Sequence, residues 1–229
     1  MKKTNWKKLG SEFLSIFIAV TMAFSLNNWN ENRRDNKAAS KILAEISHGL
    51  EKDIEDVRVN QGGHKDGILA CNFWRDVLQD NEVNSDSLIQ YYFNLTRDYI
   101  SVQNISGYES LKSKGLELIK DDSLRFEIIT LYEYDYSILK KFEEEYTEMQ
   151  YQENYFKEIN NKLAPNLKFN ENGNIIGIKL PLRLNEVEKN ILLSYLWKIE
   201  VNRNFLIKFY SVTEKKQMQL RKKIEQSLK

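Results

Sequence analysis

Breakers of regular structure are rare in this chain, whose 229 residues contain only nine glycines and two prolines. Because glycine and proline end helices and shape turns, their scarcity favours long helices over a sheet-rich fold with many turns. The single cysteine, Cys71, excludes an intramolecular disulfide framework and a cysteine-based zinc site. An excess of basic charge is also missing, since 34 Lys and Arg face 33 Asp and Glu. That balance argues against a nucleic-acid-binding protein.

Recognisable catalytic motifs are absent as well. The chain has no Walker-type loop, no GxGxxG, no HExxH and no GxSxG. One conceivable set of metal ligands combines His48, His64, Asp66 and Cys71, but the two histidines are sixteen residues apart. Incidental polar residues are the preferred interpretation of that set. We therefore predict no enzymatic activity, no catalytic residues, no bound metal and no cofactor.

One apolar run, residues 13–26, is interrupted only by three hydroxyl side chains, which lipid tolerates when they bond to helix carbonyls. Trp6 precedes the run and Trp29 follows it, roughly 34 Å apart along a helix. This separation is close to the ~30 Å hydrocarbon core, at whose two interfaces tryptophan is enriched. The run predicts a transmembrane helix over residues 10–29. The expected membrane-interface residues are Trp6, Glu12, Asn27, Asn28, Trp29, Asn30 and Glu31.

A cleaved export signal is the alternative interpretation of the N-terminus. Four early lysines and the small-x-small sequence Ala23-Phe24-Ser25 are typical of such signals. Against it, no proline or glycine follows the run, and the helical pattern continues past it. Lysine-rich N-terminal tails stay cytoplasmic. We therefore predict a cytoplasmic tail (residues 1–9), one span across a bacterial inner membrane, and a periplasmic domain (residues 30–229).

Small residues recur every fourth position on one face of the span: Ser11, Ser15, Ala19 and Ala23. Such residues let two helices approach closely, and packing rather than hydrophobicity drives helix association in lipid. This face predicts self-association into a homo-oligomer.

Beyond the span the pattern is helical, which predicts an all-α fold whose transmembrane helix continues into an extended bundle. Apolar residues spaced by three and four mark the inner face of the first bundle helix, namely Ile42, Leu43, Ile46, Leu50, Ile54 and Val57. Gln61-Gly62-Gly63 predicts a break or weak point after it. A heptad-like apolar stripe from residue 139 to 156 is typical of coiled-coil packing.

Three further features complete the predicted bundle. The acidic run Glu143-Glu144-Glu145 is expected on a solvated face, and the nearby tyrosines are expected in the core. An Asn172-Gly173 turn signal predicts a small β-hairpin or irregular loop near residues 165–184. Asn185 and Glu188 resemble a capping box that starts a final helix. The basic, polar end of that helix is expected to project from the bundle.

Two blocks of the sequence carry a resemblance to a known family. The apolar run ends in Asn-Asn-Trp-Asn-Glu, residues 27–31, followed by basic residues. This ending is similar to the N-terminal signature of a bacterial domain-of-unknown-function family of single-pass membrane proteins. Residues 107–136 resemble the second block of that family, a Tyr-Glu-x-Leu-Lys motif followed by a Leu-Arg helix start. The resemblance implies an uncleaved anchor and carries no established activity.

Together these features predict a membrane-anchored helical protein that self-associates and binds an unidentified protein partner or senses a condition. Two alternatives stay open. An oligomeric channel-like or membrane-perturbing effector would line a pore with the hydroxyls of Ser15, Thr21 and Ser25. A small-ligand binder or enzyme would use a polar pocket lined by Tyr132, Tyr136 and Arg125 in the tyrosine-rich interior.

Overall fold

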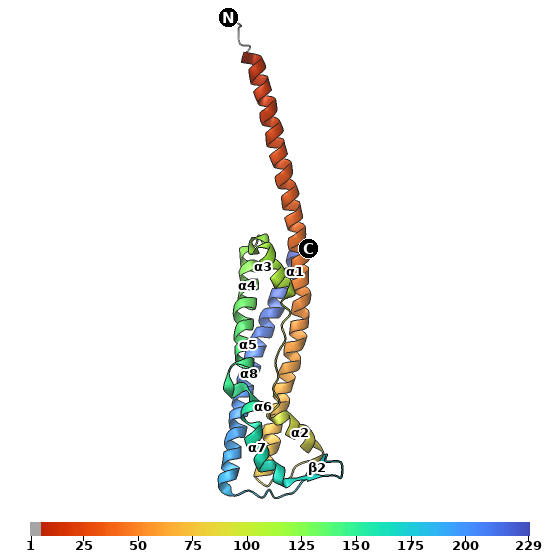
Figure 1. Ribbon diagram of the computed structural model, residues 1–229, viewed down its shortest axis with the longest axis vertical. Helices are drawn as coiled ribbons and strands as arrows, with labels where there is room; N and C mark the ends of the chain where they lie inside the picture. Colours follow the sequence, from red (N-terminus) through yellow and green to blue (C-terminus); the bar gives the residue numbers. More distant parts are fainter. Residues whose placement is uncertain (1–5) are drawn as a thin grey trace.

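The computed structural model describes residues 6–229 and the side-chain surroundings from residue 10 onward. Most of the chain is helical and one small two-stranded sheet is present in this range, which confirms the predicted all-α class. One very long helix rises from an elongated bundle and leaves its N-terminal part free (Figure 1). The first five residues of the expected cytoplasmic tail lie outside the described residues.

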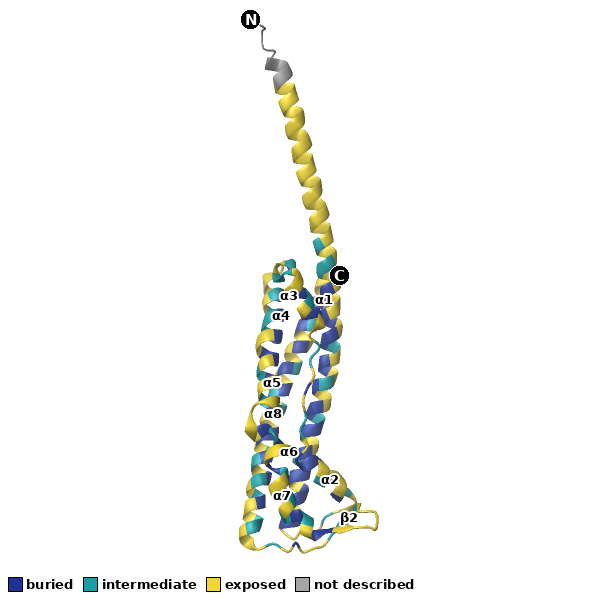
Figure 2. Cartoon of the chain, viewed as in Figure 1, coloured by how far each residue is buried: buried dark blue, intermediate teal, exposed yellow. Residues whose placement is uncertain are grey.

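Helix α1 (Trp6–Leu78) is 73 residues long, about 110 Å at 1.5 Å per residue. From residue 10 onward its N-terminal part is exposed on all sides, and the first buried side chain in that range is Ile42 (Figure 2). All six predicted inward residues between Ile42 and Val57 are buried. The apolar run and the first bundle helix are therefore one continuous helix.

The predicted break at Gly62-Gly63 is wrong, because α1 runs through both glycines without interruption. Gly63 instead allows a close approach, since a Cβ atom there would lie 2.1 Å from the ring of Tyr99. A Cβ atom on Gly62 would meet nothing within 4 Å. Packing against Tyr99 therefore requires glycine at position 63, whereas no neighbouring atom requires it at position 62.

Helix α8 (Glu186–Ser227) runs antiparallel along α1 and makes the main helix pair of the bundle (Figure 1). The capping box of Asn185 and Glu188 is confirmed, with both reciprocal hydrogen bonds present. The prediction that the basic tail projects is wrong. Leu220 and Ile224 are buried in a core cluster with residues of α1 and α4, so the tail packs while its charged residues face solvent.

Shorter elements cover this pair. They are α2 (Leu88–Leu95), α3 (Ser106–Lys114), α4 (Asp122–Ile129), α5 (Tyr136–Glu144), α6 (Tyr151–Asn154) and α7 (Phe156–Leu163). A π-helical turn, Thr130–Asp135, joins α4 to α5. Strands β1 (Leu167–Phe169) and β2 (Ile175–Ile178) pair antiparallel around a turn in which Gly173 adopts φ 75°, which confirms the predicted hairpin.

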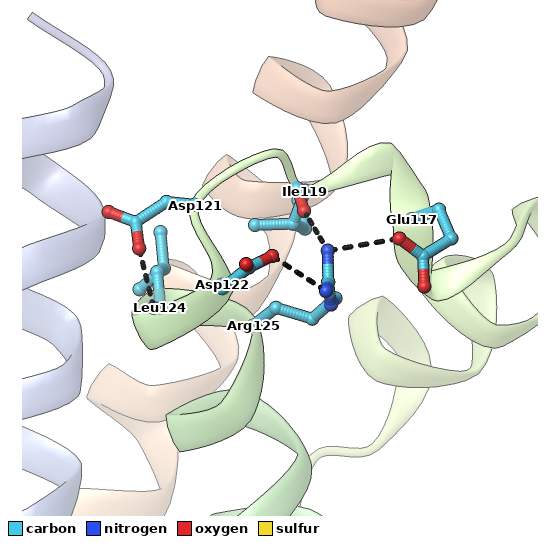
Figure 3. Close-up of polar contacts among 6 residues, drawn as sticks. All are labelled: Glu117, Ile119, Asp121, Asp122, Leu124 and Arg125. Carbon is cyan, nitrogen blue, oxygen red and sulfur yellow. Dashed lines mark hydrogen bonds and ion pairs between the residues drawn. The ribbon is translucent and has the colours of Figure 1, made fainter.

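The start of α4 illustrates how a local sequence ends one element and begins the next (Figure 3). Asp121 is the N-cap, and its carboxylate accepts the amide N–H of Leu124 at 3.0 Å. Arg125 donates to the carbonyl of Ile119 at 2.9 Å and forms ion pairs with Asp122 and Glu117. Through these contacts, Arg125 holds the turn that precedes α4. This turn lies at the end of the bundle from which the free part of α1 extends (Figure 1).

We expect Gly63→Ala to lower the free energy of unfolding by about 1–3 kcal/mol, because the added methyl group overpacks the contact with Tyr99. The matched change Gly62→Ala is expected to raise it by up to about 1 kcal/mol through helix propensity. Urea unfolding of the two variants, followed by circular dichroism, measures both. Equal effects of the two substitutions would contradict the assigned packing.

A buried polar network as the candidate functional site

An extended segment, Arg97–Ile105, joins α2 to α3 and runs beside α1 (Figure 1); we call it the strap. The strap belongs to no helix or sheet, so its backbone amides need other acceptors. Carboxylates of the surrounding helices supply them. The amide of Asn104 donates to Asp53 at 2.7 Å, and that of Val102 donates to Asp56 at 2.9 Å.

Glu143 on α5 holds the middle of the strap. Its Oε1 accepts the backbone N–H of Ser101 at 3.2 Å and the Ser101 hydroxyl at 2.9 Å. The hydroxyl of Tyr210 on α8 donates to the same carboxylate. Glu143 is only 4% exposed, so the prediction of a solvated face is wrong for this member of the acidic run. Glu144 and Glu145 beside it are exposed, as predicted.

Asp53 on α1 makes an equivalent junction closer to the free end of α1. Besides the strap amide, it accepts the hydroxyl of Tyr136 at 2.6 Å, and Gln217 on α8 donates to that phenol oxygen at 3.0 Å. Each junction therefore joins the strap to two or more helices through one buried carboxyl group. Loss of either carboxyl would leave buried donors without a partner.

Burial shifts the pKa values of both carboxyl groups upward. Removal from water raises the pKa of Glu143 to about 7, against lowering by the hydrogen bonds from Tyr210 and Ser101. The same cause raises the pKa of Asp53 to about 6, against lowering by Tyr136 and the Asn104 amide. The negative charge of nearby Asp56 raises both. Both groups therefore change protonation state near neutral pH.

A buried cation lies at the other end of the strap. Arg203 on α8 is fully buried, and its guanidinium lies 4.3 Å from the ring centroid of Tyr151. Its Nη2 donates to the backbone carbonyls of Leu95 at 3.1 Å and Arg97 at 2.9 Å, where α2 ends and the strap begins. Positive charge at a helix C-terminus is favourable, so Arg203 fixes the end of α2.

His64 on α1 completes this cationic junction. Its Nδ1 lies 3.2 Å from Nη1 of Arg203. Because a guanidinium only donates, Nδ1 accepts the hydrogen bond and the imidazole is neutral. Burial, with the charge of Arg203, lowers the pKa of His64 to about 3. Gly67 gives the guanidinium its space, since a Cβ atom there would lie 2.4 Å from Arg203.

The conceivable metal set is not assembled. His48 is exposed beside Glu51, whereas His64 is buried against Arg203. In the part of the chain with described side chains, no group of three or more His, Cys, Asp or Glu could hold a metal ion. Burial raises the pKa of the Cys71 thiol to about 12, which keeps it protonated and unreactive as a nucleophile.

The tyrosine-lined pocket expected for a ligand binder is not formed by the three residues named for it. Tyr132 and Tyr136 pack in an apolar core cluster with Leu111 and Ile128. Arg125 belongs to the surface contacts at the start of α4 (Figure 3). The expectation that the tyrosines of this region form core is confirmed for Tyr132, Tyr136, Tyr151 and Tyr155, and it is wrong for Tyr134 and Tyr146, which are exposed.

The structure places the predicted membrane residues on the free part of α1. The small side chains Ser11, Ser15, Ala19 and Ala23 are all exposed. At the interface positions, Asn27 donates to Glu31 at 3.1 Å. The guanidinium of Arg33 lies 5.7 Å from the ring of Trp29. Asn28 and Asn30 are exposed, and Glu12 provides the carbonyl for the Ser15 hydroxyl. Trp6 lies in the first turn of α1.

Sequence reasoning missed the members of the buried network on α8. Arg203 and Gln217 occupy core-facing positions between Ile199, Leu206 and Leu220, at helical spacing. Their position could have been predicted from the sequence, because polar residues at the apolar spacing of a long helix indicate buried groups with specific partners. Glu143 gave no comparable local signal.

Searches of the chain against protein-family models, curated proteins and solved structures found no match. The resemblance to the family of single-pass membrane proteins therefore remains a prediction from the two sequence blocks. A role for the bundle must therefore be inferred from its own structure, above all from the buried polar network.

The raised pKa of Glu143 predicts the sign of a pH dependence. On folding, the pKa rises from 4.5 to about 7, so the folded protein keeps a proton that the unfolded chain releases. The contribution of Glu143 to the free energy of unfolding is thus largest below pH 4.5 and falls by about 3 kcal/mol as the pH rises through 7.

We expect Glu143→Gln to reduce this fall, since the amide keeps the size of the side chain and has no charge to bury. Glu144→Gln alters the exposed neighbour and should leave the fall in the free energy of unfolding the same as in the wild-type protein. Urea unfolding at pH 5 and pH 8 measures both slopes. An unaltered slope in Glu143→Gln would refute the protonated, buried carboxyl.

Proposed function

We propose that this protein is a single-pass anchor in a bacterial inner membrane whose periplasmic bundle is a non-enzymatic sensing or partner-binding module. The observation that carries the proposal is the continuity of α1. An apolar window of mean hydropathy 1.3 with no buried residue lies on the same uninterrupted helix as the bundle core. The helix is long and apolar enough to cross a membrane by length and composition.

The exposed apolar side chains support an anchor rather than a solvated rod. Phe13, Phe17 and Phe24 are each more than half exposed, which water disfavours and lipid accepts. The Ser15 hydroxyl donates to the carbonyl of Glu12 at 2.9 Å, and that of Thr21 to Phe17 at 2.8 Å. These hydroxyls are satisfied within the helix, so they do not require a water-filled pore.

The direction of the small-residue face supports self-association of whole chains. Ala19 and Ile46 are 27 residues apart on one helix, which places their side chains on roughly opposite sides at 100° per residue. Ile46 faces the bundle core. Two spans that meet through Ala19 would therefore hold their bundles outward, without a clash between them.

The buried network supports a sensing role for the bundle. Asp53 and Glu143, whose pKa values lie at about 6 and about 7, hold the strap against α1 and α5. Their protonation near neutral pH changes the charge inside the bundle that packs against α1, and α1 is the helix that continues into the apolar run. A change in the bundle would then be transmitted along α1 as a rigid element.

Topology is tested with C-terminal fusions to alkaline phosphatase, which is active only after export, and to a cytoplasmic fluorescent reporter. We expect an active phosphatase fusion that stays in the membrane fraction after alkaline washing and retains its N-terminal residues. Ile18→Arg, at mid-span, should release the protein from that fraction, since arginine there costs about 2.5–3.5 kcal/mol. Mature protein that begins at Leu26, or is soluble unchanged, would refute the anchor.

Self-association is tested by disulfide crosslinking in a Cys71→Ala background. We expect Ala19→Cys to form a covalent dimer on oxidation in the membrane, because the small-residue face brings the two helices close. Phe17→Cys, on roughly the opposite side of the same helix, serves as the matched control and should stay monomeric. Equal crosslinking at the two positions would count against a specific interface.

A further inference from the structure

The outer face of α8 exposes an apolar stripe. Trp197, Val201, Phe205 and Val212 recur at intervals of four and seven residues and are between 43% and 62% exposed. On the other side of the helix, Leu196, Ile199 and Leu206 are buried toward α1. The stripe extends for about 22 Å, or four helical turns.

Aromatic side chains widen this stripe at the seam between α5 and α8. Phe142 on α5 packs edge-on against Phe205 and Phe209, with ring centroids 5.1 Å apart in each pair. Tyr146 lies 5.2 Å from Phe142 and is itself exposed. Clusters of aromatic residues that combine large apolar area with few rotatable bonds are typical centres of binding interfaces.

Charge on α8 is divided between its two sides. The carboxylates Glu200 and Glu214 pair with Arg75 and Arg58 on α1. The outer face carries Lys208 and Lys215, which are exposed and form no ion pair within residues 10–229. At 100° per residue both lysines lie in the same sector of α8 as the apolar stripe, so the unpaired charge on that face of α8 is positive. The exposed Glu145 lies next to Tyr146 on the other side of the seam.

We propose that the outer face of α8, with the α5 seam, docks an amphipathic helix of a partner protein whose apolar stripe is flanked by carboxylates. The inference rests on the partner-binding part of the proposed function and names the chemistry of that partner. A straight apolar stripe of four turns matches the stripe of a partner helix.

The same observations disfavour the other occupants. Two copies of the chain meeting through this face would bring Lys208 and Lys215 of both chains together. A bilayer surface would require α8 to lie in the membrane plane, whereas α8 runs alongside α1 (Figure 1). The face also points away from α1, and therefore away from contacts made through the span.

The probes are two synthetic helical peptides of about four turns with identical leucine stripes, one flanked by glutamate and one by lysine. We expect full-length protein in nanodiscs of zwitterionic lipid to bind the glutamate-flanked peptide at least tenfold more tightly, measured by fluorescence anisotropy. Val201→Asp should weaken that binding at least tenfold. Val59→Asp makes the same change on an exposed valine of α1 and should leave binding unaltered.

Charge reversal gives a readout that a folding defect would not produce. The double variant Lys208→Glu with Lys215→Glu should prefer the lysine-flanked peptide. Equal binding of both peptides, or no effect of Val201→Asp, would overturn the proposal. Two other results would also overturn it: a dimer in detergent that Val201→Asp dissociates, or vesicle binding that requires anionic lipid and these two lysines. The peptide assay does not depend on membrane topology, so it tests the docking face separately from the anchor. Peptide binding can be absent although the fusions confirm the anchor, and it can be present although the fusions show no export.

Discussion

From Ile42 to Leu78, one face of α1 packs against α8, and the shorter elements of the bundle are built on that pair. Three apolar clusters lie along the pair, and α1 and α8 contribute to each of them. The buried apolar residues of helices α2 to α7 belong to these shared clusters. Their positions follow from where this helix pair leaves exposed apolar surface and unsatisfied polar groups.

Polar residues interrupt the apolar contacts of the helix pair at intervals. Asp53 and His64 on α1 and Arg203 on α8 are buried between the clusters, and each is hydrogen-bonded to a partner distant in sequence. An apolar interface would be easier to stabilise, because burial of a charge costs more than its pairing returns in most settings. The buried carboxylates provide a defined register for the strap, because they accept the backbone amides of Ser101, Val102 and Asn104.

The buried network and the proposed docking face lie on opposite sides of the same helical turns. Phe142 and Phe209 belong to the outer aromatic cluster, while the adjacent Glu143 and Tyr210 are joined by a hydrogen bond inside the bundle. A partner that orders these turns would act on the same backbone that positions the buried carboxyl. Because α1 packs against α8 here and continues into the apolar run, it connects this region to the proposed span.

The sequence by itself determined the helical class, the exposed apolar run, the inner face of α1, the hairpin turn and the capping box of α8. Each depends on local spacing or on a few neighbouring residues, which a one-dimensional pattern records. Only the tertiary structure decided that Glu143 is buried while Glu144 and Glu145 are not, because the deciding partners, Ser101 and Tyr210, are 42 and 67 residues away. Likewise, Gly62-Gly63 has the local composition of a break, but packing along α8 and the strap keeps the helix continuous and uses the missing side chain of Gly63 to admit Tyr99.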